Sequence, residues 1–215
     1  NQSKGRPVVP FSCAGGPLLP HRRRGFGGHH GSERIGKTTL LNILGTLDRP
    51  DSGEVLLDGH PVDHSRAEEL TNLRHRYIGF IFQLHHLLPQ LTVEENILLP
   101  LLPRKDKQFR EEARQRACIM MKTVGLSSLA DHFPGTLSVG ECQRTAVLRA
   151  LVHRPRLLLA DEPTGSLDAQ NAATLTGMIL ELQQQFPFAL VLVTHDNTIA
   201  VRMQKQLRLI NGQLK

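Results

Sequence analysis

One short stretch limits what this chain can fold into more than any other. Residues 31–39 read Gly-Ser-Glu-Arg-Ile-Gly-Lys-Thr-Thr and fit the spacing of a phosphate-binding loop, G-x-x-x-x-G-K-[ST]. Such a loop turns backbone N–H groups toward phosphate oxygens, a lysine reaches the β- and γ-phosphates, and a hydroxyl binds Mg²⁺. We predict that five residues bind nucleotide phosphates: Gly31, Gly36, Lys37, Thr38 and Thr39. Residues 39–44 should form the helix whose N-terminus faces the phosphates. Taken alone, the pattern would also fit an ordinary surface loop.

After this stretch, apolar strands alternate with amphipathic helices. Residues 77–82, 156–161 and 189–194 have the composition of buried strands, and residues 105–124 and 169–185 have helical periodicity. Capping boxes open two further helices, at Thr92 with Glu95 and at Ser138 with Glu141. This alternation predicts an α/β fold of the P-loop NTPase type, with a mostly parallel sheet between helices.

Polar residues follow two of the predicted strands. Asp161 and Glu162 end an apolar run, and His195 ends the next one. Because parallel strands end at one edge of a sheet, we expect Asp161 to hold Mg²⁺ and Glu162 to take a proton from an attacking water. His195 would contact the γ-phosphate and hold that water. The alternative interpretation is a solvated acidic turn and a polar strand cap.

The basic character of the chain is confined to its beginning. The net charge is +6, of which residues 1–36 hold +5, from six Lys or Arg against one Glu. We therefore predict no nucleic-acid partner for the body. Residues 1–30 resemble no element of an α/β domain, and we predict a poorly ordered segment there. Its triple arginine, residues 22–24, is interpreted as part of a solvated tail rather than an anion-binding patch. The sequence contains neither a visible signal peptide nor an apolar run long enough to span a bilayer.

The motifs from the phosphate loop onward together resemble the nucleotide-binding domain of ABC transporters. They follow in the order of that family: Gln83 after an apolar strand, the signature Leu137-Ser138-Val139-Gly140-Glu141, Ala160-Asp161-Glu162-Pro163-Thr164, the D-loop Ser166-Leu167-Asp168 and the switch Thr194-His195-Asp196. The resemblance covers residues 36–215. It implies an ABC ATPase domain over residues 31–215, with a helical subdomain at about residues 84–150.

The resemblance also implies roles for these residues in an ATPase that uses ATP and Mg²⁺. The metal would be held by Thr38, Gln83 and Asp161, with Glu162 and His195 as the catalytic residues. ATP would lie between two subunits of a head-to-tail homodimer, where Ser138 and Gly140 of one subunit cap the γ-phosphate bound by the other. Asp168 is counted among the nucleotide-binding residues. Gln83 would sense the nucleotide and couple it to integral membrane permease subunits.

Finer features resemble the lipoprotein-releasing type within the family. Residues 83–89, Gln-Leu-His-His-Leu-Leu-Pro, are the main one. They imply a peripheral protein on the cytoplasmic face of the bacterial inner membrane that drives lipoprotein release. Macrolide-export and cell-division types share most of these features and remain alternatives. A third alternative is an impaired product that binds ATP weakly.

The sequence departs from the family at two places. Val139 stands where the signature has a glycine, which predicts weaker closure of the dimer. In the phosphate loop, Arg34 and Ile35 replace a glycine and a small residue, and no aromatic residue for stacking on adenine can be placed. Codons for residues 29–36 can be chosen so that the same DNA, read from one base later, encodes Ile-Met-Gly-Ala-Ser-Gly-Ser-Gly. We therefore hypothesise that the residues before Gly36 are a frame-shifted translation.

Overall fold

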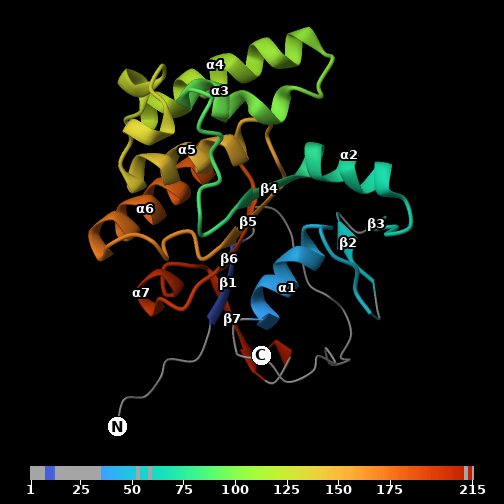
Figure 1. Cartoon of the computed structure of the whole chain (residues 1–215). Coiled ribbons are helices and arrows are strands. Elements are labelled where there is room, and N and C mark those ends of the chain that lie inside the picture. Colours follow the sequence, from blue (N-terminus) through green and yellow to red (C-terminus); the bar gives the residue numbers. More distant parts are fainter. Residues whose placement is uncertain (1–7, 13–34, 52–53, 58–59, 211–212, 215) are drawn as a thin grey trace.

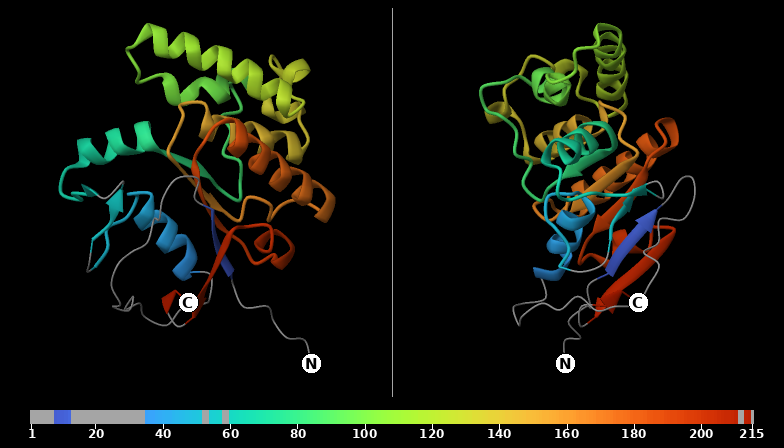
Figure 2. Two further views of the ribbon diagram at one scale, coloured as in Figure 1. Left: turned by 180° about the vertical axis from the view of Figure 1, so that it is seen from behind. Right: turned by 90° about the vertical axis from the view of Figure 1, so that its right-hand side faces the viewer.

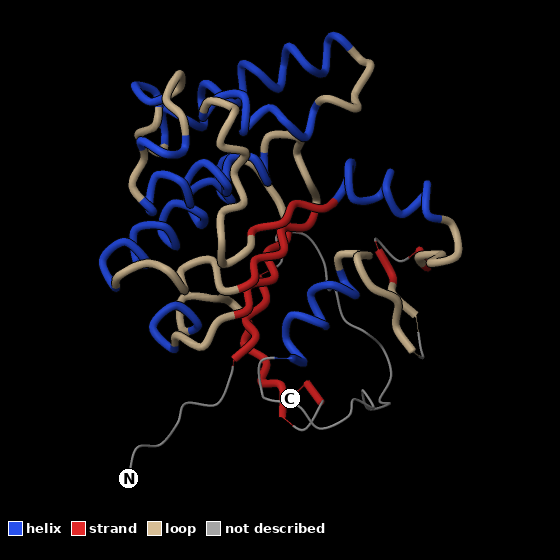
Figure 3. Tube along the Cα trace, in the orientation of Figure 1, coloured by secondary structure: helices blue, strands red, loops and turns tan. Residues whose placement is uncertain are grey.

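A central sheet organises the molecule. The computed structural model describes residues 8–12, 35–51, 54–57, 60–210 and 213–214. In them, a six-stranded sheet has the order β4-β5-β6-β1-β7-β8, with helices on both faces (Figure 1 and Figure 3). The strands are β1 (Val8–Ser12), β4 (Ile78–Ile81), β5 (Leu157–Asp161), β6 (Ala189–Val193), β7 (Lys205–Ile210) and β8 (Gln213–Leu214), and a separate pair is formed by β2 (Leu56–Leu57) and β3 (His60–Pro61).

The helices follow the predicted alternation. They are α1 (Ile35–Leu44), α2 (Ala67–Tyr77), α3 (Val93–Leu98), α4 (Lys107–Thr123), α5 (Val139–Leu151), α6 (Ala169–Gln185) and α7 (Asn197–Ala200), with 3-10 turns at Leu99–Leu101, Ser127–Leu129 and Pro134–Thr136. Both predicted capping boxes are present: the side chains of Thr92 and Ser138 accept from the N–H groups of Glu95 and Glu141. Residues 58–59 and 211–212 read Asp-Gly and Asn-Gly, which favour hairpin turns, but they lie outside the described residues. The strands that flank each pair are antiparallel.

The parallel part of the sheet is buried on both faces. β5 pairs in parallel with β4 and β6, with Leu159 opposite Phe80 and Val191. Successive side chains of β5 alternate between two cores: Leu159 packs with Leu41 of α1, whereas Leu158 packs with the helices α5 and α6 on the other face. This double burial explains the continuous apolar runs of the strands. It also fixes where each strand ends, and therefore where Asp161 emerges.

β1 differs from the prediction that residues 1–30 contribute no element. It lies between β6 and β7 and runs antiparallel to both, with Phe11 opposite Val191 and Lys205 (Figure 2). Two β-branched residues, Val8 and Val9, favour a strand, and the gap between β6 and β7 supplies partners for its backbone. Because β1 is antiparallel, Ser12 pairs with Leu190, near the start of β6 and away from the end that leads to His195. The rest of residues 1–30 lies outside the described residues.

Candidate nucleotide-binding and catalytic site

The first turn of α1 carries the lysine and threonines of the phosphate-loop motif. Gly31 lies outside the described residues. The helix begins at Ile35, so the prediction that it begins at Thr39 is wrong. Ile35 has less conformational freedom than a glycine would have, and the chain takes ordinary helical geometry from this residue onward. Gly36 packs closely on β7, because a Cβ at this position would lie 2.9 Å from Leu209 Cδ2.

Thr38 meets the end of β5. Its Oγ1 donates to Asp161 Oδ2 at 2.9 Å. Burial raises the pKa of the Asp161 carboxyl, and the nearby Glu162 acts in the same direction, while the Thr38 hydroxyl and Lys37 oppose them. Residues 123 positions apart in the chain are thus joined at the predicted phosphate and metal site.

Glu162 lies between Lys37, which is predicted to bind phosphates, and His195, which is predicted to be catalytic. Its Oε1 is 3.9 Å from Lys37 Nζ, and its Oε2 is 2.7 Å from His195 Nδ1. The Lys37 side chain is only 9% exposed and that of Glu162 18%, whereas the His195 side chain is 68% exposed. Glu162 has a φ of +47°, a left-handed conformation that is strained for a residue with a Cβ. The strain occurs where the chain turns out of β5, and it directs the carboxylate to this cluster.

Gln83 approaches the same turn from β4. The side chain of Gln83 lies against Gly165, where an added Cβ would be 2.9 Å from Gln83 Nε2 and 3.2 Å from Cδ. Gly165 N–H in turn donates to the carbonyl of Glu162 at 2.9 Å. The packing therefore brings Gln83 to the segment that follows Asp161 and Glu162.

The signature and D-loop residues stand apart from this cluster. Ser138 caps α5 and contacts Glu141, and Gly140 lies in the first turn of the same helix. Asp168 caps α6, and the pKa of its carboxyl is lowered, chiefly by the backbone N–H of Asn171. Among the described residues, no hydrogen bond or ion pair joins Ser138, Gly140 or Asp168 to Lys37 or Glu162.

Sequence reasoning missed the residues that hold the segment after β4. We call residues 83–91 the Gln83 segment. The Asn96 amide is fully buried and bonds to the backbone of Leu88 in both directions. Two side chains of α5, Gln143 and Arg149, bond to carbonyls in or next to this segment. A Gln or Arg in a helix gives no pattern that distinguishes such a contact from solvent exposure.

The chain matches a known family over most of its length. The family described as ABC transporter matches residues 20–165. The chain therefore belongs to the ABC transporter family. This membership confirms the predicted P-loop ATPase fold and the predicted ATPase class, and nucleotide binding follows from it.

Similar proteins within the family point to one type of ABC transporter. The lipoprotein-releasing system ATP-binding protein LolD of Francisella tularensis subsp. holarctica is 46% identical over 180 residues, which cover 84% of this chain and 78% of that protein. LolD of Psychrobacter arcticus is 47% identical over 182 residues, covering 85% and 80%. The predicted resemblance to the lipoprotein-releasing type is confirmed.

Solved structures agree with the fold. A dimeric structure of MJ0796, a bacterial ABC transporter cassette, has 35% identity and a TM-score of 0.68 over 81% of both chains. A post-hydrolysis state of that cassette bound to ADP and Pi has 33% identity and a TM-score of 0.66 over the same share of each chain. Within the part of the present chain that the structure describes, no helix has the length and apolarity to cross a membrane.

Proposed function

We propose that this chain is the ATP-hydrolysing subunit of a transporter that releases lipoproteins from the bacterial inner membrane. The observation that carries the proposal is the meeting of Lys37, Thr38, Asp161, Glu162 and His195 at one edge of the sheet. The identity to LolD proteins supports the substrate class.

The donor set at this edge suits Mg²⁺ and phosphate. Thr38 and Asp161 offer hard oxygen ligands 2.9 Å apart, and Lys37 supplies a nearly buried positive charge. No group of three or more His, Cys, Asp or Glu that could hold a metal occurs among the described residues. Mg²⁺ is usually held in proteins by one or two carboxylates, and water and substrate phosphates fill much of the rest of its shell. When bound, the metal neutralises charge developing on the phosphates. Gln83 is proposed as a further ligand.

Glu162 is proposed as the general base. Its carboxylate accepts the proton of a water that attacks the γ-phosphate, while His195 holds Glu162 and contacts that phosphate. Lys37 balances the charge of Glu162 before the nucleotide enters and binds the phosphates afterwards. The strained backbone of Glu162 orients the carboxylate in advance, and such pre-organisation lowers the cost of reaching the reactive geometry.

Removing the base tests this assignment. Glu162→Gln keeps the size of the side chain but cannot accept the proton, so we expect hydrolysis to fall by about 100-fold or more, with ATP affinity unchanged within about threefold. The matched control is Glu181→Gln, an exposed position on α6 that belongs to none of the motifs. Steady-state phosphate release and a fluorescent ATP titration give the two values. A Glu162→Gln variant as active as its parent would contradict the role.

The separation of the signature from the cluster supports a dimer. Within the described part of the chain, neither Ser138 nor Gly140 forms a hydrogen bond or ion pair with Lys37, so we propose that they serve the nucleotide of a partner copy in a head-to-tail homodimer. Glu162→Gln with ATP should form a dimer that is stable in gel filtration, and adding Ser138→Arg should return it to a monomer. Persistence of the dimer in that double variant would exclude the proposed interface.

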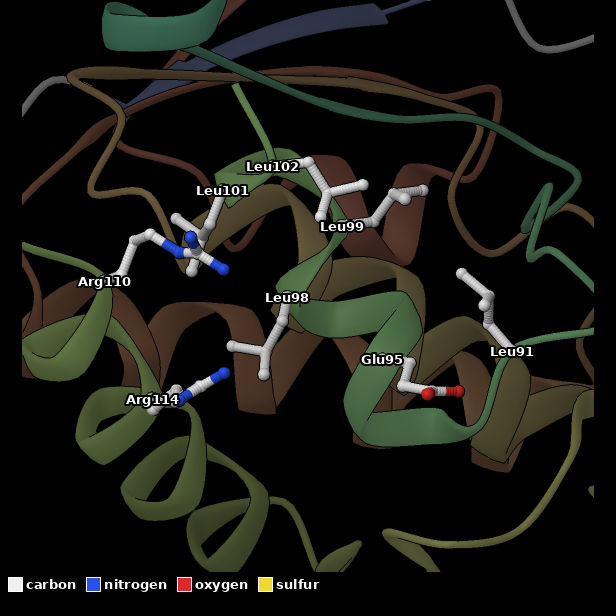
Figure 4. A pocket seen from close by; sticks show the side chains of 8 residues that line it. All are labelled: Leu91, Glu95, Leu98, Leu99, Leu101, Leu102, Arg110 and Arg114. Carbon is white, nitrogen blue, oxygen red and sulfur yellow. The ribbon is translucent and has the colours of Figure 1, made fainter. Parts of the chain in front are cut away.

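An apolar groove beside α3 is proposed to receive the permease. It is lined by leucines and rimmed by charge: Leu91, Glu95, Leu98, Leu99, Leu101, Leu102, Arg110 and Arg114. Figure 4 shows Arg110 and Arg114 reaching from α4 toward Leu98 and Leu101. Leu102 and, in the Gln83 segment, Leu84 are 67% and 64% exposed. This composition fits an amphipathic helix with an acidic end, and it supports a peripheral location on the cytoplasmic face of the inner membrane.

Two variants, one inside the groove and one outside it, test whether the permease docks there. Leu102→Asp should abolish co-purification with the permease subunits. Ile119→Asp, on α4 outside the groove and 56% exposed, is the matched control and should retain it. Equal retention by both variants would remove the groove from the interface.

A further inference from the structure

The Gln83 segment must be held in place without a sheet or helix of its own. It connects β4 to α3 and runs beside α5 (Figure 1). Most of its residues are exposed, and His86 has a φ of +46°. A left-handed residue with a Cβ persists only where surrounding contacts fix it. Asn96 fixes the segment at Leu88. The residues nearer to Gln83 need other contacts.

Arg149 supplies these contacts. From the last turn of α5, its Nη1 donates to the carbonyl of His86 at 2.7 Å and its Nη2 donates to the carbonyl of His85 at 2.6 Å. The planar guanidinium is suited to such a two-pronged contact, and a lysine ammonium would lose its fixed geometry. Among the described residues, no carboxylate forms an ion pair with Arg149. Its charge is therefore satisfied by backbone carbonyls of this segment.

A second side chain of α5 extends the connection. Gln143 Nε2 donates to the carbonyl of Phe82 at 3.0 Å and to that of Pro163 at 2.8 Å. The first carbonyl precedes Gln83, and the second follows Glu162 by one residue. The same helix begins at Ser138. One rigid element therefore contacts the Gln83 segment and the turn after the catalytic acid, and it carries the signature at its N-terminus.

We propose that Arg149 is a positioning residue for the ATPase reaction, which fixes the carbonyls of His85 and His86 and so holds Gln83 against Gly165. The proposal deepens the proposed function and rests on it for the role of Gln83. Through this contact the Gln83 segment and α5 move as one body.

Backbone hydrogen exchange tests the contact directly in the full chain without nucleotide. In Arg149→Met, which keeps the apolar stem, we expect the amides of Leu87 and Leu88 to exchange about tenfold faster, because the segment loses its anchor. Arg149→Lys should fall between this variant and the parent. The matched control is Arg116→Met. Arg116 is a buried arginine that, like Arg149, donates two hydrogen bonds to backbone, but both go to the carbonyl of Val152, outside the segment.

The outcomes separate positioning from general stability. Faster exchange confined to residues 84–91 supports the proposal. Unchanged exchange there, or faster exchange that extends equally to β5, would overturn it, and so would the same local effect in Arg116→Met. In ATPase assays kcat should fall about tenfold in Arg149→Met with the KM for ATP within about twofold. An inactive parent chain would contradict the proposed function, while the exchange comparison would still decide the role of Arg149.

Discussion

The chain after Gly36 folds as its sequence motifs predict, whereas the described part of the chain before Gly36 does not. After it, motif, strand and helix reinforce each other: β4, β5 and β6 are parallel and buried, and each leads to a residue of the candidate site. Before it, the described residues form one strand, β1, which fills a place in the sheet in the antiparallel sense. A strand in that direction does not lead into the phosphate loop at the catalytic edge.

A strand that joins a sheet has to meet fewer structural requirements than a loop that binds phosphate. β1 needs only backbone partners and β-branched residues, and it even includes Pro10, which cannot donate to the ladder. A phosphate loop needs a specific direction, a specific end point and permissive backbone angles. The hypothesis of a frame-shifted translation would explain why β1 runs in the antiparallel sense and why Arg34 and Ile35 stand where the family has small residues.

The largest expected effect is a loss of folding stability at low pH, caused by a buried histidine in the part of the chain after Gly36. His153 is 5% exposed, its Nε2 is 3.1 Å from the carbonyl of Ile78 in β4, and burial lowers its pKa to about 4. The unfolded chain therefore binds this proton more readily, and stability is lost as the pH falls from about 6.5 toward 4. The loss would reach about 3 kcal/mol.

Urea unfolding at several pH values measures this loss. His153→Gln keeps a donor for Ile78 and does not titrate, so its free energy of unfolding should fall less over the same range. Parallel pH profiles for the two proteins would show that His153 is not coupled to the fold.

Repairing the phosphate loop addresses the other side of the comparison. Arg34→Gly with Ile35→Ser restores the small residues of the family pattern, and we expect ATP affinity to rise about 100-fold, or about 2.7 kcal/mol. Adding Lys37→Ala to the repaired chain should remove most of the gain. Equal affinity before and after repair would mean that residues 34–35 do not limit binding. Sequencing the coding DNA tests the frame-shift hypothesis independently.

The contribution of β1 is expected to be smaller. Deleting residues 1–12 removes the ladders to both β6 and β7, and the free energy of unfolding should fall by about 2 kcal/mol. Deleting residues 1–7 leaves β1 intact and serves as the control. If both deletions unfold at the same urea concentration, the strand adds nothing to stability.

The smallest effect is expected at Val139. This residue is 53% exposed at the first position of α5, where its side chain would face a partner's nucleotide. Val139→Gly should raise the ATPase rate about threefold through easier dimer closure, although glycine has a lower helix propensity than valine. Rates equal to those of the parent would show that the valine does not hinder closure.

Local rules in the sequence determined much of the fold and the site. Apolar runs predicted the parallel strands, the Thr92 and Ser138 boxes predicted two helix starts, and the motif order predicted which residues would converge. These features are readable because each depends on residues close together in the chain, or on a periodicity that burial imposes.

Other features were decided only by the tertiary structure. The direction of β1 depends on the space that the rest of the sheet leaves open between β6 and β7. The hold of Arg149 on His85 joins residues 64 positions apart. Such a contact uses a side-chain donor and a backbone carbonyl, and because every residue other than itself offers the same carbonyl, the sequence gives no sign of which one is chosen.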